Sequence, residues 1–304
     1  MGEELENHLT NTILKLEEID VNLYRGSNLW KPVRSRAVFG GQVVGQALVA
    51  ASKTVADHLH VHSLHTYFIR PGDNTLPILY HVDRLRDGNS FSTRSVKATQ
   101  NGNTIITMQV SYHKEEEGVL SHQYTMPHAP PPDKLRTTEE CLRTFLQDTR
   151  TSKQSKATIQ KVLADEIPIE VKPVDPLLFF SRKRHSDVHT STYNQGVITP
   201  WYNLVVNIVV VADISRGSNL WKPVRSRAVF GGQVVGQALV AASKTVADHL
   251  HVHSLHTYFI RPGDNTLPIL YHVDCLRDGN SFSTRSVKAT QNGNTIITMQ
   301  VSEG

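Results

Sequence analysis

The stretch AVFGGQVVGQALVAASKTV fills residues 37–55, and the same letters return at residues 228–246. Its apolar residues recur at steps of three and four, which is the period of an amphipathic helix. They are Val43, Val44, Ala47, Leu48, Ala51 and Val55. Gly40 and Gly41 open the pattern, and the small residues inside it would let a sheet pack closely against the helix. We expect the fold to form around this helix, which the chain carries twice.

The repetition extends well beyond the helix. Residues 25–111 match residues 216–302 at every position but one, where Arg84 in the first copy is Cys275 in the second. Repeated folding units normally diverge, because only their packing pattern has to persist. Such identity indicates either a recent duplication or an error in assembling the gene. In both cases the chain holds two copies of one folding unit, named here the first copy (25–111) and the second copy (216–302).

Strand-like segments surround the helix. In the first copy they cover residues 60–72, 76–85, 90–99 and 103–113, and residues 17–26 offer one strand before the helix. Turn signals separate them, and the strongest hairpin signal is Asn101-Gly102. Strands linked by hairpins form an antiparallel sheet. Since one long apolar helix must be buried, we expect the sheet to curl around it in an α+β arrangement.

Composition places the chain among ordinary globular proteins. Its 304 residues suffice for two domains, and 39% of them are hydrophobic. The net charge of +4 is carried by scattered basic residues and does not indicate nucleic-acid binding. Two cysteines suit a reducing compartment. The expected divisions are an N-terminal domain over residues 10–115, a linker with a divergent segment over 116–215, and a second domain over 216–304.

Five ordered motifs carry a family resemblance. They are LYRG (23–26), FGGQVVGQALVAA (39–51), VHSLHTYFIRPGD (61–73), RDGNSFSTRSVKATQNG (86–102) and HQYTMPHAPPPD (122–133). Together they resemble the N-terminal half of type II acyl-CoA thioesterases, the TesB-like and peroxisomal group. The resemblance runs from about residue 10 to residue 176 and implies a double hotdog, in which two helix-in-sheet units share one chain. It also implies hydrolysis of acyl-CoA to a fatty acid and CoA.

The resemblance assigns catalysis to the second hotdog. In the family, the second hotdog supplies an aspartate near the start of its helix, a Ser or Thr on the next strand and a Gln on the last strand. The nearest matches here are Asp213, Ser254 and Gln300, with Ser63 as the first-copy twin of Ser254. The second helix begins without a carboxylate, and Asp213 lies well upstream, where it also fits a turn or strand end. Ser254 is equally well explained as a strand serine bonded to a neighbouring backbone group.

The glycine-rich helix starts are the candidate substrate-binding segments. They comprise Gly231, Gly232 and Gln233 in the second copy and Gly40, Gly41 and Gln42 in the first. A helix N-terminus offers free N–H groups and a positive dipole end, which suit a developing oxyanion. A Gly-Gly pair before a helix also occurs for steric reasons alone.

Other polar residues have structural explanations. His60 and His62 alternate on a strand, as metal ligands can, but no clear third ligand accompanies them, so we interpret them as surface or core histidines and expect no metal. Arg94 and Lys97 could meet CoA phosphates, although a solvated strand face is the simpler interpretation.

The function expected from the resemblance is acyl-CoA thioesterase activity in fatty-acid metabolism, with acyl-CoA as substrate and no cofactor. One alternative is a catalytically impaired, acyl-CoA-binding or structural relative that lacks the family's aspartate. Another is the product of a mis-assembled gene. We expect neither nucleic acid nor membrane as partner, and homo-oligomers are compatible with open sheet edges. The resemblance implies the peroxisomal matrix, yet the chain ends in VSEG rather than Ser-Lys-Leu, which leaves the cytoplasm as the other location.

Overall fold

The computed structural model describes residues 9–33, 35–118, 122, 125, 129–165, 170–176, 192–194, 220, 222 and 228–304. The chain divides into two compact units. One holds residues 1–15, 28–39 and 116–203, and the other holds residues 16–27, 40–115 and 204–304. The helix and the sheet of both copies thus belong to the same compact unit, the one that holds residues 40–115 and 204–304. The domain limits at 115/116 and 215/216 stay predictions, and the latter lies outside the described residues.

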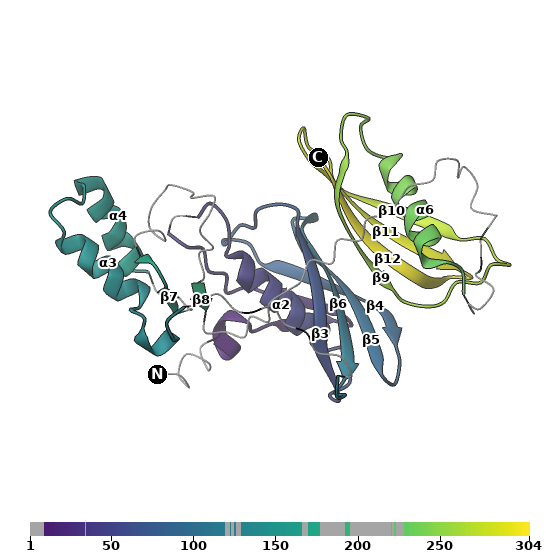
Figure 1. The fold of residues 1–304 in the computed structure, drawn as a ribbon, viewed down its shortest axis with the longest axis horizontal. Helices are drawn as coiled ribbons and strands as arrows, with labels where there is room; N and C mark the ends of the chain where they lie inside the picture. The colour runs from purple at the N-terminus through teal and green to yellow at the C-terminus, as the bar shows by residue number, and fades with distance from the viewer. Residues whose placement is uncertain are drawn as a thin grey trace. The chain divides into compact units, whose positions relative to one another are not determined.

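The first copy forms a helix packed on a six-stranded sheet (Figure 1). The helix α2 covers Gly40–Ser52, beginning where the Gly-Gly pair predicts. The sheet has the order β1-β2-β4-β5-β6-β3, and all its neighbours are antiparallel. Its strands are β1 (Glu17–Asp20), β2 (Leu23–Gly26), β3 (Leu59–Phe68), β4 (Ile78–Asp87), β5 (Phe91–Gln100) and β6 (Asn103–Lys114).

Two details of the expected sheet are wrong. Residues 17–26 form two strands instead of one, because Asn22 adopts a φ of 61° and turns the chain back on itself. Asparagine is among the few residues that tolerate this left-handed conformation. In addition, β3 does not pair with β4, its successor in the chain, but lies at the sheet edge against β6. The segment around Pro71-Gly72 is therefore a crossover connection.

The hairpin predicted at Asn101-Gly102 is confirmed. The two residues have φ angles of 48° and 75° and link β5 directly to β6. Positive φ at both central positions is what a type I′ turn requires, and its twist matches that of the flanking strands. The second copy repeats it, with Asn292 at 48° and Gly293 at 75°.

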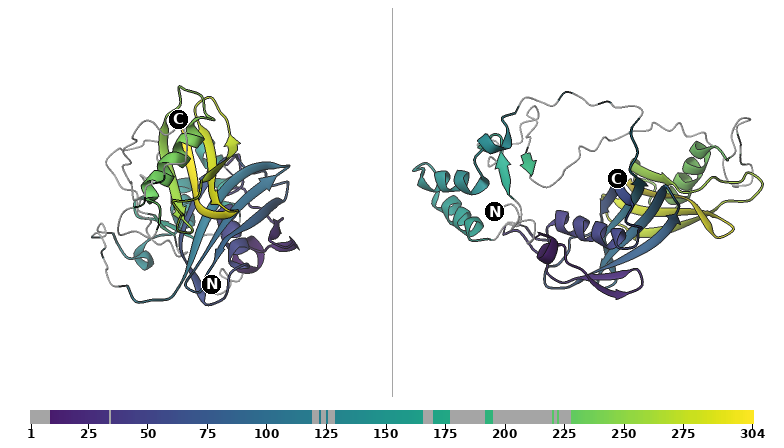
Figure 2. Two further views of the ribbon diagram at one scale, coloured as in Figure 1. Left: turned by 90° about the vertical axis from the view of Figure 1, so that its right-hand side faces the viewer. Right: turned by 90° about the horizontal axis from the view of Figure 1, so that it is seen from below.

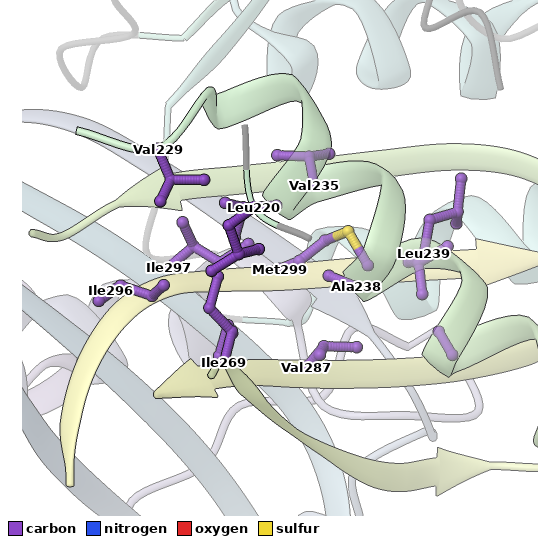
Figure 3. Packing of buried hydrophobic residues seen from close by; sticks show 14 residues of the cluster. Leu220, Val229, Val235, Ala238, Leu239, Ile269, Val287, Ile296, Ile297 and Met299 are labelled. Carbon is purple, nitrogen blue, oxygen red and sulfur yellow. The ribbon is translucent and has the colours of Figure 1, made fainter. Parts of the chain in front are cut away.

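The second copy folds in the same way around its own helix, α6 (Gly231–Ser243). Its four-stranded antiparallel sheet has the order β10-β11-β12-β9. The strands are β9 (Val252–Phe259), β10 (Leu270–Arg277), β11 (Ser283–Gln291) and β12 (Asn294–Glu303). Figure 3 shows the core between helix and sheet, where Ala238 of α6 lies beside Met299 of β12; Val235 and Ile297 belong to the same cluster.

In the described part of the unit that holds residues 116–203, the helices α3 (Thr138–Gln147) and α4 (Lys153–Leu163) contact each other (Figure 2). Thr137 caps α3 in a capping box with Glu140, so each side chain accepts from the other residue's backbone N–H. Shorter elements are the π-helix η1 (Leu9–Ile13), the 3₁₀ helix η2 (Pro132–Lys134), and the paired strands β7 (Val171–Pro173) and β8 (Thr192–Asn194). Among the helices that the structure describes, none has the length and apolar character needed to cross a membrane.

Each copy of the repeat is thus one apolar helix packed on an antiparallel sheet, which is the hotdog arrangement. The expected α+β double hotdog is confirmed.

Candidate active site

Two serine–tyrosine pairs join the two copies. The Ser63 hydroxyl lies 2.8 Å from the Tyr258 hydroxyl, and the Ser254 hydroxyl lies 2.6 Å from that of Tyr67. Ser63 is equivalent to Ser254, and Tyr67 is equivalent to Tyr258, so the two hydrogen bonds are equivalent as well. A pseudo-twofold axis therefore relates β3 to β9. The partner of the predicted catalytic Ser254 is consequently a tyrosine side chain, whereas the sequence suggested a backbone group.

A pair of stacked histidines lies between these serine–tyrosine pairs. The rings of His65 and His256 have centroids 3.9 Å apart and planes 3° from parallel. Burial, followed by the charge of its neighbour, lowers the pKa of His65 to about 4, and burial lowers the pKa of His256. Both imidazoles are therefore neutral at pH 7. They contribute to the contact between the copies.

Buried glutamines complete this polar layer. Gln300 lies opposite His256 in the β9–β12 register, and its twin Gln109 lies opposite His65. Both are almost fully buried, and neither Oε1 atom has a hydrogen-bond partner among the described residues. Because alternate residues of a strand share a face, Ser254, His256 and Gln300 all point the same way. The structure therefore brings two predicted catalytic residues, Ser254 and Gln300, onto one face of the second sheet.

A separate cavity of about 310 Å³ lies at the start of α6. Phe230 precedes the helix, and its own side chain makes no capping hydrogen bond. The first turn carries no acidic residue. The cavity walls are Ala228, Val229, Gly231, Val234, Phe259, Ile260, Pro262, Gly263, Ile296 and Ile297, with Arg86 and Arg261 as the charged members. A positive helix end faces a cavity that aliphatic side chains and two arginines line together, an arrangement that suits a carbonyl oxygen attached to an aliphatic chain.

Gly231 lies against the Phe259 ring of β9. A Cβ atom built on it would lie 2.7 Å from that ring, so the ring, which is 62% exposed, would have to shift. A Cβ atom on Gly232 would in the same way displace the ring of Phe230, which precedes the helix. The absence of a side chain at Gly231 thus allows the start of α6 to lie close to β9, in line with the steric interpretation of the motif.

The predicted site residues fall on two sides of β9. Phe259 touches Gly231 at the α6 start, while Ser254 and Gln300 face the first copy. Since successive side chains of a strand alternate between faces, Ser254 and Phe259 point in opposite directions. One thioester at the α6 start cannot touch Gly231 and Ser254 together. Asp213 lies outside the described residues.

The equivalent positions of the first copy are built alike. Gly40 begins α2, and a Cβ on it would lie 2.8 Å from the Phe68 ring. Gly41 is exposed, but Gln42 is buried inside the helix–sheet contact. A ligand could therefore reach the Gln42 side chain only inside the protein. Gln233, its equivalent in the second copy, is only partly buried.

Arg94 does not belong to the solvated strand face that the sequence suggested, whereas the side chain of Lys97 is exposed. Arg94 is fully buried: its Nε donates to the Thr54 hydroxyl at 2.7 Å and its Nη2 to the Thr54 carbonyl at 2.7 Å. It fastens the chain that leaves α2 and is unavailable to CoA. Lys97 forms an ion pair with Asp274 of the other copy, and their twins Lys288 and Asp83 do the same.

Sequence reasoning missed two side chains near the α6 start. The Thr257 hydroxyl is buried, has no partner among the described residues, and lies on the α6-facing side of β9. Arg86 belongs to the first copy yet lines the cavity of the second. The alternation of β9 could have identified Thr257, whereas nothing in the sequence places Arg86 against the other copy. Within the described residues, no group of three or more His, Cys, Asp or Glu could hold a metal ion.

The sequence of this chain is similar to those of known acyl-CoA thioesterases. The family model described as the acyl-CoA thioesterase N-terminal domain matches residues 28–113 and again residues 219–304. Human acyl-coenzyme A thioesterase 8 is 46% identical over 173 residues, which are 57% of this chain and 54% of the relative. The peroxisomal acyl-coenzyme A thioester hydrolase 1 of Saccharomyces cerevisiae is 38% identical over 99 residues, or 32% of this chain and 28% of that protein.

The chain thus spans about half the length of the mammalian relatives it matches. Among solved structures, an acyl-CoA thioesterase II from Mycobacterium marinum is 26% identical, with a TM-score of 0.38 over 96% of this chain and 95% of its own.

Proposed function

Because this chain belongs to the family of acyl-CoA thioesterase N-terminal domains, we propose that it binds acyl-CoA and hydrolyses the thioester to a fatty acid and CoA. In this reaction the oxygen of water attacks the thioester carbonyl, and the carbonyl oxygen becomes an oxyanion. The carbon–sulfur bond then breaks, and the sulfur leaves as the thiol of CoA after taking up the proton that the water gives up.

The cavity at the start of α6 carries this proposal. Its aliphatic and aromatic walls would accept an acyl chain, because burial of apolar surface is favourable. The N–H groups at the helix start would stabilise the oxyanion that forms in the transition state. In this arrangement the Gly231 backbone, which lines the cavity, lies nearest the reacting carbonyl.

One feature favours a second candidate function, namely acyl-CoA binding with little hydrolysis. The residues that line the cavity include no aspartate or glutamate, and the first turn of α6 has none. Loss of a general base costs on the order of 10²–10⁴ in rate. Asp213 remains the proposed source of a carboxylate, as the resemblance suggests.

The remaining site assignments are also proposals. Ser254, Ser63 and Gln300, the residues that the resemblance suggests, would act only on a thioester bound in the layer between the copies instead of at the start of α6, and there the Oε1 atom of Gln300 has no hydrogen-bond partner among the described residues. We further propose a role in fatty-acid metabolism. The name of the yeast relative supports a peroxisomal location. We also propose that the chain forms homo-oligomers, because open sheet edges can pair with another copy.

Release of CoA thiol from octanoyl-CoA and palmitoyl-CoA by the purified full chain tests the proposal. We expect turnover above the uncatalysed rate. A thioether analogue that cannot be hydrolysed separates the two candidate functions, with its binding measured by calorimetry. Analogue binding without thiol release would identify a binding protein. A chain whose circular dichroism is that of a folded protein, yet which neither binds nor hydrolyses, would contradict both.

A further inference from the structure

Two arginines, one from each copy, hold the copies together beside the α6 cavity. Arg86 donates from Nη1 to the Ile260 carbonyl oxygen at 2.6 Å, and Arg261 donates from Nη1 to the Leu85 carbonyl oxygen at 2.9 Å. Each guanidinium thus binds the residue preceding the other arginine. This reciprocal contact fixes the Arg86 side chain at the wall of a cavity that otherwise belongs to the second copy.

Arg86 makes one hydrogen bond to the described protein, whereas Arg261, the other charged side chain of the cavity, makes two. A guanidinium has five N–H donors. Arg261 divides its Nη1 between the Leu85 and Thr295 carbonyls. For Arg86, the bond to Ile260 is the only one that the guanidinium makes to the described residues. Several Arg86 donors can therefore serve a molecule inside the cavity.

The charge of Arg86 also matches the other polar feature of the cavity. The start of α6 is the positive end of the helix dipole, and Arg86 adds a full positive charge at the same cavity. These two features attract a neutral carbonyl oxygen only modestly. They stabilise a negatively charged oxygen far more, because its full charge interacts with both of them.

We propose that Arg86, supplied by the first copy, stabilises the oxyanion formed from a thioester bound at the start of α6. The inference rests on the proposed hydrolysis and adds a residue to it. A phosphate of CoA is the other anion that a guanidinium could meet, but most of the lining residues are aliphatic or aromatic, which favours the acyl and thioester end of the substrate. The second copy would consequently depend on the first for its chemistry.

The chain provides its own control for the structural contribution of Arg86. Arg277 is the twin of Arg86 and donates from Nη1 to the Ile69 carbonyl oxygen at 2.8 Å, but it does not line this cavity. Arg86→Gln and Arg277→Gln each remove one such contact between the copies. Equal melting midpoints for the two variants would show that the Arg86 contact and the Arg277 contact stabilise the fold to the same extent.

The test measures kcat and KM of the full chain for octanoyl-CoA and for the octanoyl thioester of N-acetylcysteamine, which has no phosphate. We expect Arg86→Gln to lower kcat about 10²-fold on both substrates, the usual effect of losing one oxyanion donor. Arg277→Gln should leave kcat close to that of the unmodified chain, and Arg86→Lys should recover part of the loss. Equal losses in both glutamine variants would overturn the inference, as would a loss confined to KM for the CoA substrate.

A binding measurement keeps the inference separate from the proposed function. Octanoate, the product, presents a carboxylate where the oxyanion would form, and its affinity can be measured by calorimetry. We expect Arg86→Gln to weaken it about tenfold or more, the effect of a lost charge-assisted hydrogen bond, and Arg277→Gln to leave it unchanged. If the unmodified chain does not hydrolyse thioesters, the proposed function fails while this difference still tests the anion site. Equal octanoate affinities in the two variants would overturn it.

Discussion

His65 and His256 stack face to face, with ring centroids 3.9 Å apart, at the centre of the contact between the two copies. The Nε2 atom of His65 has no hydrogen-bond partner among the described residues. The residues that surround the stack are neutral, namely Ser63, Tyr67, Gln109, Ser254, Tyr258 and Gln300. Nothing in this layer compensates a positive charge, so the contact requires neutral imidazoles.

The first prediction is that the free energy of unfolding decreases as the pH falls. The pKa of His65 is 6.5 in the unfolded chain and about 4 in the fold, so between these values the unfolded chain binds the additional proton. Stability therefore rises with pH across this window and is lost on acidification from about pH 6.5 to about pH 4. Urea unfolding at a series of pH values measures the slope.

His65→Gln is the matching variant, because it keeps a polar side chain and removes the titrating group. The slope between about pH 6.5 and about pH 4 should become shallower. It should not vanish, since His256 retains a lowered pKa from burial. An unchanged slope would show that His65 is not buried as described.

The second prediction concerns the buried arginines. Arg94→Met would leave the Thr54 carbonyl without its donor, and an unpaired buried polar group costs about 1–3 kcal/mol, so we expect a loss of about 2–3 kcal/mol in unfolding free energy. The twin variant Arg285→Met should cost about the same, because Arg285 makes the same bonds to Thr245.

Arg143→Met provides the exposed control. Arg143 forms an i,i+4 pair with Glu139 on the surface of α3, a type of contact worth about 0.3–0.5 kcal/mol. Chemical denaturation of the three variants gives the comparison. If Arg94→Met were as mild as Arg143→Met, the buried bonds to Thr54 would not be stabilising.

The third prediction separates Ser254 from the thioester. Ser254→Ala and Ser63→Ala each remove one serine–tyrosine hydrogen bond between the copies, which is worth about 1 kcal/mol. Equal shifts in melting midpoint are expected. If the thioester lies at the α6 start, neither variant changes kcat, because Ser254 faces the other side of β9. A large loss of kcat in Ser254→Ala alone would instead support the role that the resemblance assigns to it.

Much of the fold could be predicted because local signals decide it. The three- and four-residue period places α2, and Asn101-Gly102 places the β5–β6 hairpin, since few other residues adopt its φ angles. The turn at Asn22 was missed because an isolated asparagine in an alternating segment has no such distinctive signal. The position of β3 beside β6 was missed because pairing between distant segments leaves no mark in local periodicity.

The site was less predictable for a related reason. The glycines at the α6 start are conspicuous in the sequence, and a Cβ on Gly231 would clash with Phe259. The side on which Ser254 lies depends on strand register, where a displacement of one residue exchanges the two faces. The placement of Arg86 depends on contact between the two copies, which neither copy encodes alone.

The central claim is that the thioester binds at the start of α6, and two glycines of that helix test it most directly. Gly231→Ala places a Cβ against Phe259, whereas Gly236→Ala in the same helix places one where no atom lies within 4 Å. Gly236→Ala should retain activity and stabilise the helix by up to about 1 kcal/mol.

The measurement is kcat/KM for octanoyl-CoA by thiol release, with both alanine variants shown to be folded. We predict a large loss in Gly231→Ala and none in Gly236→Ala. Full activity in a folded Gly231→Ala chain would contradict the account and move the reaction away from the start of α6.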